Sequence, residues 1–234
     1  MHVPDGFLDA PTSVATGVVA VAAVGVALRG ARRELDDRTA PLAGLVAAFV
    51  FATQMLNFPV GAGTSGHLMG GALAAVLVGP WTGMLCVSVV LMVQALLFAD
   101  GGITALGTNI ILMAVVTVAV SWLVFAALRA VLPKRIAMVA PAAAVGALLS
   151  VPAAAAVFSL LYLVGGTADI PFGALLATML GWHTLIGLGE AVITFLAVGS
   201  ILAVRPDLVH GARPLLARRE LAIKRPTEDT EAVA

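Results

Sequence analysis

The feature that most constrains the fold of this sequence is a run from Pro41 to Leu128 that carries one formal charge, Asp100. A soluble domain carries a charge at about one residue in four, because water must solvate its surface. Lipid must therefore solvate much of this run. In the whole chain 61% of residues are hydrophobic and 11% are charged, which excludes an ordinary soluble enzyme and a disordered chain. We expect an all-α, polytopic membrane protein.

The apolar segments predict about seven transmembrane helices, since one span needs about 20 apolar residues. The expected helices are Thr12–Leu28, Pro41–Asn57, His67–Val78, Trp81–Phe98, Thr104–Leu132, Ile136–Val164 and Trp182–Val204. The third is short for a span. A single helix from His67 to Phe98 is the alternative, although it would have to run through Gly79-Pro80, a dipeptide that breaks or kinks helices.

Basic residues decide between these two topologies. With seven spans and the N-terminus outside, all thirteen Lys and Arg residues fall on the cytoplasmic side, whereas six spans divide them between the two sides. The positive-inside rule prefers seven. We therefore expect an outer N-terminus and a cytoplasmic C-terminus. Residues 1–204 would form one membrane domain, with spans from 12 to 204, and residues 205–234 a charged cytoplasmic tail.

This topology gives the outer face acids and histidines but no basic side chain: Asp5, Asp9, Asp100, Asp169, His2, His67 and His183. Such a face attracts cations, although the depletion of external Lys and Arg would leave the same acids. The net charge of zero gives no sign of nucleic-acid binding. The single cysteine, Cys86, excludes a disulfide framework and a cysteine-rich metal site.

The N-terminal segment 1–10 is the first candidate metal-binding element, and it carries no sign of a cleavable signal peptide. We expect Met1 to be retained, because the bulky His2 disfavours its removal. The α-amine of Met1 and the amide nitrogen of His2 would close a five-membered chelate ring. That amide and the His2 Nδ1 would close a six-membered ring. Three coplanar nitrogens favour Ni²⁺ or Cu²⁺ and can suit Co²⁺, although any chain that begins Met-His offers them.

Two further motifs could contribute to a site. A polar, glycine-rich segment from Asn57 to His67 joins two spans, and irregular backbone at membrane depth lines a cavity or is buried in protein. His67 is therefore either a fourth nitrogen ligand or, as is more usual for a histidine at a helix start, a cap or hydrogen-bond donor. His183 and Glu190, seven residues apart at the start of the last span, share one helix face. Ionisable residues inside a span indicate function, but Glu190 could equally be protonated or bonded to a neighbouring helix.

Together these residues resemble the CbiM/NikM family, the substrate-capture components of energy-coupling-factor transporters for cobalt and nickel. The resemblance covers residues 1–204 and is most specific at 1–8, 63–67 and 183–190. It implies a square-planar site made by the amine of Met1, the amide and imidazole of His2, and the imidazole of His67. Four further residues would surround that site without binding the metal: Asn57, Ser65, His183 and Glu190.

The resemblance also implies partners: a transmembrane coupling subunit, two cytosolic ATPases and a small accessory membrane subunit, in the plasma membrane of a prokaryote. The chain itself would be no enzyme and hold no cofactor, with Ni²⁺ or Co²⁺ as transported substrate, and it has no phosphate-binding G-x-x-x-x-G-K-[ST] motif. Neighbouring cobalamin-biosynthesis genes would favour cobalt. Small residues on the first span offer a partner-docking face, namely Thr16, Ala20, Ala23 and Ala27.

A second function class competes with transport. Gly63-Thr64-Ser65-Gly66 matches the nucleophile turn of rhomboid-like intramembrane serine proteases, and His183 could act as the base. Two features argue against this reading. Ser65 lies in a predicted loop between the second and third spans, rather than at the start of a late core helix, and a protease leaves the Met1-His2 terminus unexplained.

Overall fold

The structure is a computed structural model that describes residues 2–37, 39–61 and 64–223. Its α-helices in this part of the chain are α1 (Ala10–Ala31), α2 (Thr39–Gln54), α3 (Gly71–Val78), α4 (Pro80–Leu97), α5 (Leu106–Ile110), α6 (Thr117–Val131), α7 (Val139–Gly165), α8 (Phe172–Val204) and α9 (Arg213–Ile223). Single helical turns are η1 (Ile111–Val116, π-helical) and the 3-10 turns η2 (Ile136–Met138), η3 (Pro206–Leu208) and η4 (His210–Ala212). Two short antiparallel strands, β1 (Phe58–Gly61) and β2 (Thr64–Gly66), follow α2.

Five helical stretches of the described residues are long and apolar enough to cross a membrane: Ala10–Ala31, Pro80–Leu97, Leu106–Val131, Ile136–Gly165 and Phe172–Val204. The apolar helix α2 is shorter, with 16 residues. The prediction of an all-α, polytopic membrane protein is therefore confirmed. The count of seven spans and the orientation of the termini stay predictions.

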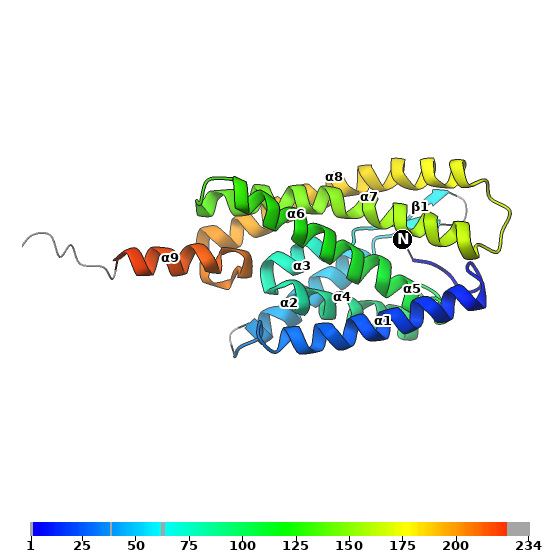
Figure 1. Ribbon diagram of the computed structural model, residues 1–234, viewed down its shortest axis with the longest axis horizontal. Helices are drawn as coiled ribbons and strands as arrows, with labels where there is room; N and C mark the ends of the chain where they lie inside the picture. Colours follow the sequence, from blue (N-terminus) through cyan, green and yellow to red (C-terminus); the bar gives the residue numbers. More distant parts are fainter. Residues whose placement is uncertain (1, 38, 62–63, 224–234) are drawn as a thin grey trace, which may run out of the picture.

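The two longest helices, α7 and α8, run side by side along the molecule, and α1 lies along the opposite side (Figure 1). Helices α3 to α6 fill the space between them (Figure 1). Small residues permit the close packing. A Cβ on Gly187 of α8 would come within 2.8 Å of the Leu148 carbonyl oxygen on α7, and one on Gly146 of α7 within 2.7 Å of the Ser121 carbonyl on α6.

Helices α3 and α4 are separate, so the alternative of one continuous helix from His67 to Phe98 is wrong. Gly79 joins them with a φ of +99°, which continues no right-handed helix. The chain then folds back, because a Cβ on Gly83 would lie 2.8 Å from the Ala75 amide nitrogen. All eight residues of α3 are buried. A helix of that length rises about 12 Å, well short of the ~30 Å hydrocarbon core.

The predicted start of the last span at Trp182 is also wrong, because α8 begins at Phe172. Pro171 occupies the N-cap position of α8. Its ψ of 125° lies outside the helical region, as is usual for an N-cap residue, so the helix begins with the residue that follows. Apolar residues and glycines then continue the helix without a break. His183 therefore lies well inside α8 rather than near its first turn, and its side chain is fully buried.

The chain before α1 turns back into the bundle. The Asp9 carboxylate caps α1 by accepting a hydrogen bond from the Thr12 amide at 2.9 Å. The Asp9 amide donates to the Gly165 carbonyl at 2.7 Å, and Leu8 pairs with Gly166 in a β-bridge. These contacts tie the start of α1 to the end of α7, and residues before Leu8 enter the bundle at this level.

After α8 the chain also returns to the bundle. Val209 and Ala212 are fully buried, and a Cβ on Gly211 would lie 2.8 Å from the Phe125 ring of α6. Residues 206–215, which begin the predicted charged tail, therefore include an apolar segment that packs at the end of α6.

Candidate metal centre

His2 and Val3 of the N-terminal segment are buried in the bundle. Val3 is 1% exposed, and Asn109 of α5 holds both of its backbone groups. The Val3 amide donates to the Asn109 Oδ1 at 2.8 Å, and the Asn109 Nδ2 donates to the Val3 carbonyl at 3.2 Å. The Gly102 amide adds a third hydrogen bond to that carbonyl, at 2.9 Å. Gly102 must be small, since a Cβ there would overlap the Asp5 backbone.

The imidazole of His2 is buried and oriented by Gln94 of α4. The His2 Nε2 lies 3.2 Å from the Gln94 Oε1. An amide oxygen only accepts hydrogen bonds, so Nε2 carries the hydrogen. The other ring nitrogen, Nδ1, lies 3.2 Å from a carboxylate oxygen of Asp100. Asp100 therefore places a carboxylate directly beside Nδ1.

Asp100 links His2 to the glycine-rich segment. The Asn57 side-chain amide donates to the second carboxylate oxygen of Asp100 at 3.0 Å. The nearby His2 imidazole holds the pKa of the Asp100 carboxyl below its ordinary value, and the hydrogen bond from Asn57 acts in the same direction. Asp100 is therefore a carboxylate at neutral pH. Asn57 contacts this acid, and its own side chain is exposed.

His67 stacks directly on His2. The two ring centroids are 4.4 Å apart with an angle of 25° between the ring planes, and His67 is fully buried. The His67 Nδ1 lies 2.8 Å from the Leu68 carbonyl oxygen. That oxygen only accepts, so Nδ1 carries the hydrogen and Nε2 the lone pair. A hydrogen bond at one nitrogen of each ring thus directs the other nitrogen toward ligation, an arrangement typical of metal-binding histidines.

Glu190 of α8 fixes the backbone that carries His67. Its Oε2 accepts from the Met69 amide at 2.8 Å and its Oε1 from the Gly70 amide at 3.0 Å. These amides precede the first turn of α3, where the helix dipole favours an anion. Glu190 therefore bonds to the loop between β2 and α3 rather than to a neighbouring helix, and its role in the site stays a prediction.

The remaining predicted site residues contribute less to this arrangement. His183 is fully buried and its Nδ1 lies 2.8 Å from the Met179 carbonyl. Its Nε2 has no hydrogen-bond partner among the described residues. The backbone of Ser65 pairs with Pro59 in the β1–β2 hairpin. Met1 lies outside the described residues.

Three amide side chains that the sequence analysis did not single out support the site. Gln94 binds His2 and Asn109 binds Val3, as described above. Gln54 of α2 is fully buried, and its Nε2 donates to the Met69 carbonyl at 2.8 Å. Each is an uncharged polar residue inside an apolar helix. Such residues bond to neighbouring helices or loops, and this signal could have identified them.

The described residues contain no group of three or more His, Cys, Asp and Glu side chains placed to hold a metal ion. A site built on His2 and His67 must therefore draw further ligands from elsewhere. The sequence analysis predicts the backbone nitrogen of His2 as one such ligand, and this nitrogen precedes Val3, whose backbone Asn109 holds. The geometry suits a site that combines imidazole and main-chain nitrogens.

The fold and these contacts define a polytopic membrane protein in which two stacked, buried histidines meet where the N-terminal segment enters the bundle. Comparison with known proteins places the chain more narrowly. A family model described as "Cobalt uptake substrate-specific transmembrane region" (CbiM) matches residues 2–208. The chain belongs to this family, as the sequence resemblance predicted, and is a membrane transport component.

Individual relatives agree with this placement. A Haloquadratum walsbyi protein, whose name assigns it provisionally to metal transport, is 41% identical over 211 residues, covering 89% of this chain and 93% of that protein. The fused nickel transport protein NikMN of Rhodobacter capsulatus is 44% identical over 126 residues, covering 54% of this chain and 36% of that protein. A crystal structure described as a truncated transition metal transporter has a TM-score of 0.77 at 30% identity, covering 87% of this chain and 99% of that one. None of these comparisons supports the protease alternative.

Proposed function

We propose that this protein is the substrate-capture subunit of an energy-coupling-factor transporter that takes up Ni²⁺ or Co²⁺. The single observation that carries the proposal is the stacked His2–His67 pair, in which a hydrogen bond at one nitrogen of each ring fixes its orientation. Membership of a cobalt-uptake family and the nickel and transition-metal transport named for the relatives support the choice of metals.

Four nitrogens would bind the ion: the α-amine of Met1, the amide and Nδ1 of His2, and the Nε2 of His67. The two chelate rings described for the terminus would impose a square plane, which suits Ni²⁺ and can suit Co²⁺. Asp100 would balance the charge beside Nδ1. The ion is the transported substrate, and the protein would need no cofactor and perform no bond chemistry.

Four residues would support the ligands without binding the ion. Glu190 would hold the His67 loop through two backbone amides, and Asn57 would orient Asp100. His183 would occupy the buried space beneath the site as a neutral imidazole, and Ser65 would belong to the hairpin that closes over the ion. Loss of such supporting contacts costs a metal site about 10–100-fold in affinity.

The proposed setting is the plasma membrane of a prokaryote, with the N-terminus outside and residues 205–234 in the cytoplasm. A transmembrane coupling subunit and two cytosolic ATPases would drive release of the ion inward. A small accessory membrane subunit would complete the complex. Within the chain, residues 1–204 would form the membrane domain, with residues 1–10 as its metal-binding segment.

The test is to block the α-amine without changing the membrane domain. Two or three residues are added before Met1, and His2→Ala is made separately. Calorimetric titration of the purified protein with Ni²⁺ and with Co²⁺ should show that both changes abolish tight binding. His210→Ala, a histidine outside the site, is the matched control and should bind normally. Unaltered binding after the extension would overturn the role of the α-amine, and unaltered binding by His2→Ala would overturn the site itself.

A further inference from the structure

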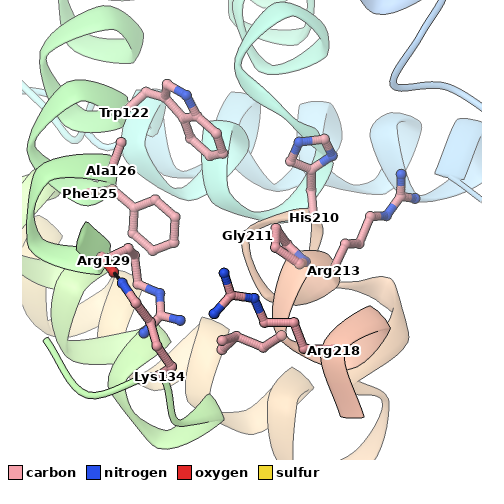
Figure 2. Close-up of a pocket in the computed structure, with 11 residues that line it drawn as sticks. Trp122, Phe125, Ala126, Arg129, Lys134, His210, Gly211, Arg213 and Arg218 are labelled. Carbon is pink, nitrogen blue, oxygen red and sulfur yellow. Dashed lines mark hydrogen bonds between the residues drawn. The ribbon is translucent and has the colours of Figure 1, made fainter. Parts of the chain in front are cut away.

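A pocket of about 360 Å³ lies at the opposite end of the α5–α6 stretch from the candidate metal centre. It is formed by the end of α6, the loop that follows it and the segment from η4 to α9. Figure 2 shows the side chains that line it, among them Trp122, Phe125, Arg129, Lys134, His210 and Arg218. Asn109 and Arg129 are twenty residues apart along one helical stretch, which corresponds to about 30 Å.

The inner part of the pocket is aromatic. The Trp122 and Phe125 rings are 5.3 Å apart, and the His210 ring lies 5.7 Å from that of Trp122. Trp122 precedes Arg129 by two helical turns, so the pocket extends about 10 Å from the end of α6 toward the membrane interior. Its inner wall can therefore contact apolar groups, while its mouth is polar.

The mouth of the pocket is basic. The side chains of Arg129 and Arg218 point toward each other across it (Figure 2). The Lys134 ammonium donates to the Ala130 carbonyl at 3.0 Å and to the Arg129 carbonyl, which holds it at the C-terminal end of α6. Among the residues whose side chains the structure describes, none that lines the pocket is acidic. Like charges that converge in this way favour an anion between them.

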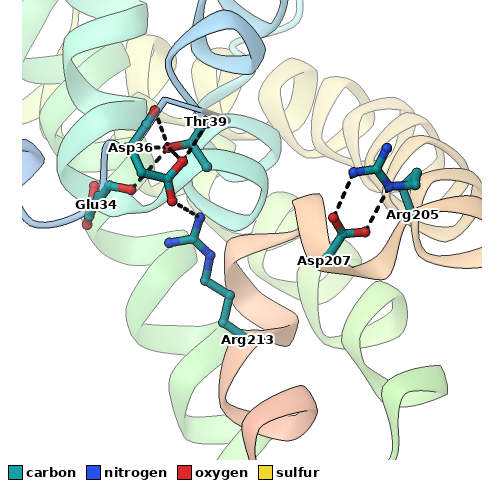
Figure 3. Close-up of polar contacts among 6 residues, drawn as sticks. All are labelled: Glu34, Asp36, Thr39, Arg205, Asp207 and Arg213. Carbon is teal, nitrogen blue, oxygen red and sulfur yellow. Dashed lines mark hydrogen bonds and ion pairs between the residues drawn. The ribbon is translucent and has the colours of Figure 1, made fainter.

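Arg213 at the same pocket is already paired. It points away toward the α1–α2 loop, where its guanidinium lies 3.5 Å from the Asp36 carboxylate (Figure 3). Among the described residues, Arg129, Lys134 and Arg218 form no ion pair with a carboxylate. The three basic side chains at the pocket that have no carboxylate partner among the described residues therefore supply its positive charge.

Exposed apolar side chains lie beside the pocket along α6, where lipid rather than water would solvate them. Leu123 is 68% exposed and Val131 79% exposed, and both belong to a helix apolar enough to cross a membrane. Along α6, Leu123 lies near the inner end of the pocket and Val131 lies just beyond its outer end. A ligand complementary to this pocket would have an apolar part, which contacts the aromatic inner wall, and an anionic headgroup, which contacts the basic mouth.

We propose that this pocket binds an anionic phospholipid, with Arg129 and Arg218 holding the headgroup phosphate and Trp122 and Phe125 contacting the glycerol and first acyl carbons. Basic pockets between transmembrane helices bind lipid headgroups by this combination of contacts. The positive-inside orientation places the pocket in the cytoplasmic leaflet, where anionic lipids attract basic residues. The lipid would clamp α9 against α6.

The experiment uses the full chain in detergent micelles. Native mass spectrometry measures the retention of dioleoylphosphatidylglycerol and of dioleoylphosphatidylcholine. The natural chain should prefer phosphatidylglycerol by about tenfold or more. Combined Arg129→Gln and Arg218→Gln substitutions should remove most of this preference. Combined Arg32→Gln and Arg33→Gln substitutions, which remove the same charge from exposed positions after α1, should keep it.

Three results would overturn the proposal: equal retention of both lipids by the natural chain, a preference that survives the pocket substitutions, or displacement of phosphatidylglycerol by millimolar inorganic phosphate. The last would identify free phosphate as the ligand. If the double variant does not fold, Arg218→Gln alone tests the proposal, because Arg218 is exposed on α9. Arg218→Lys should then restore the preference in part. Ni²⁺ binding should be unchanged in every pocket variant, which separates this proposal from that of metal capture.

Discussion

At the scale of single residues, two amide side chains decide how the N-terminal segment is held. Gln94 is fully buried and Asn109 is 1% exposed, and both lie in apolar helices where water cannot replace a lost partner. Gln94 orients the His2 ring, and Asn109 binds the backbone of Val3 from both sides. Breaking one of these hydrogen bonds should destabilise the protein by more than the bond itself contributes, because it leaves a buried polar group without a partner.

Replacing Gln94 should therefore weaken metal binding without removing a ligand. Gln94→Leu keeps the volume but deletes the oxygen that accepts from the His2 Nε2. We expect the Kd for Ni²⁺ to rise about 10–100-fold, the usual cost of losing a partner that orients a metal-binding histidine. Calorimetric titration measures it. Ser88→Ala, which removes another buried polar group from α4, is the control and should leave the Kd unchanged. An unchanged Kd for Gln94→Leu would refute the orienting role.

Asp5 provides a pH-dependent contribution to stability. Its carboxylate accepts hydrogen bonds from the hydroxyl and the amide of Thr104, and the hydroxyl contact is the main reason that the pKa of Asp5 lies below its ordinary value of 3.8. Because the folded pKa is the lower one, the stabilisation is fully present above the unfolded pKa and is lost as the pH falls through the folded pKa.

The pH dependence of the melting temperature tests this contribution. Asp5→Asn should melt below the natural protein at pH 7, and the difference should shrink as the pH falls below about 4. Asp169→Asn, an exposed acid in the α7–α8 loop, should show a smaller difference at pH 7. A difference for Asp5→Asn that stayed constant into strong acid would assign the effect to something other than the carboxylate.

The sequence could identify His2, His67 and Glu190, because each stands in a short motif with its own chemistry. It could single out Gln94 as a polar residue inside an apolar helix, but it could not identify the partner, His2, which is 92 residues away. It also could not decide between the two readings of Glu190. The spacing of seven placed Glu190 on one face with His183, but only the fold shows that its carboxylate contacts the loop before α3.

At the scale of elements, two buried glutamates hold the ends of the short helix α3. Glu190 binds the amides before its first turn. Beyond its last turn, the Glu34 carboxylate accepts from the Trp81 amide at 3.2 Å and the Thr82 amide at 2.7 Å, at the start of α4. An eight-residue helix is marginal by itself. Its stability must come from packing and from these two anchors, which also determine where the preceding loop places His67.

Gly79→Ala should therefore disturb the α3–α4 hairpin. Gly79 has a φ of +99°, and a Cβ there would lie 2.5 Å from the Glu34 Oε2. We expect a loss of about 1–3 kcal/mol from the backbone strain alone, measured by unfolding in mixed micelles. Gly44→Ala on α2, where a Cβ meets no atom within 4 Å, should be neutral or slightly stabilising. Equal stability of the two variants would contradict the close contact with Glu34.

The sequence predicts the boundaries of some helices closely and misses others, and the reason is physical in each case. Long apolar runs located α1, α4, α6 and α7 closely, because lipid requires an uninterrupted apolar stretch. The start of α8 was missed, since the run before Trp182 is equally apolar and only Pro171 marks its beginning. Three of the four residues expected to form a docking face on α1 are not available to a partner, and the fourth, Ala23, is half-buried. Thr16, Ala20 and Ala27 are buried within this chain, because small residues serve packing inside a bundle as well as between subunits.

At the scale of the whole molecule, the few polar groups are divided between two ends. The N-terminal segment, the histidine pair and Asp100 lie at one end of the α5–α6 stretch, and the basic pocket lies at the other. The composition showed only a membrane protein. The arrangement of the charges indicates which end faces outward, because basic residues favour the cytoplasmic side.

Cysteine labelling tests this orientation, and it also tests whether an odd number of crossings separates α1 from α5, as seven spans require. Cys86 is the only cysteine and is buried, so Cys86→Ser provides a background without a reactive thiol. Single cysteines are then introduced by Arg33→Cys after α1 and by Ile103→Cys before α5, both at exposed positions. Seven spans place three crossings between these positions. A membrane-impermeant maleimide should therefore label Ile103→Cys in intact cells and Arg33→Cys only after permeabilisation.

An even number of crossings gives a different pattern. If α3 and α4 together crossed once beside α2, or if the hairpin entered and left on one side and α2 did not cross, both cysteines would react under the same condition. A hairpin that entered and left on one side beside a crossing α2 would leave one crossing and give the seven-span pattern. Labelling of Arg33→Cys alone in intact cells would invert the orientation. The parent chain with Cys86 in place is the control and should stay unlabelled in both preparations, since its thiol packs inside the bundle near the Ala43 carbonyl of α2, at 3.4 Å.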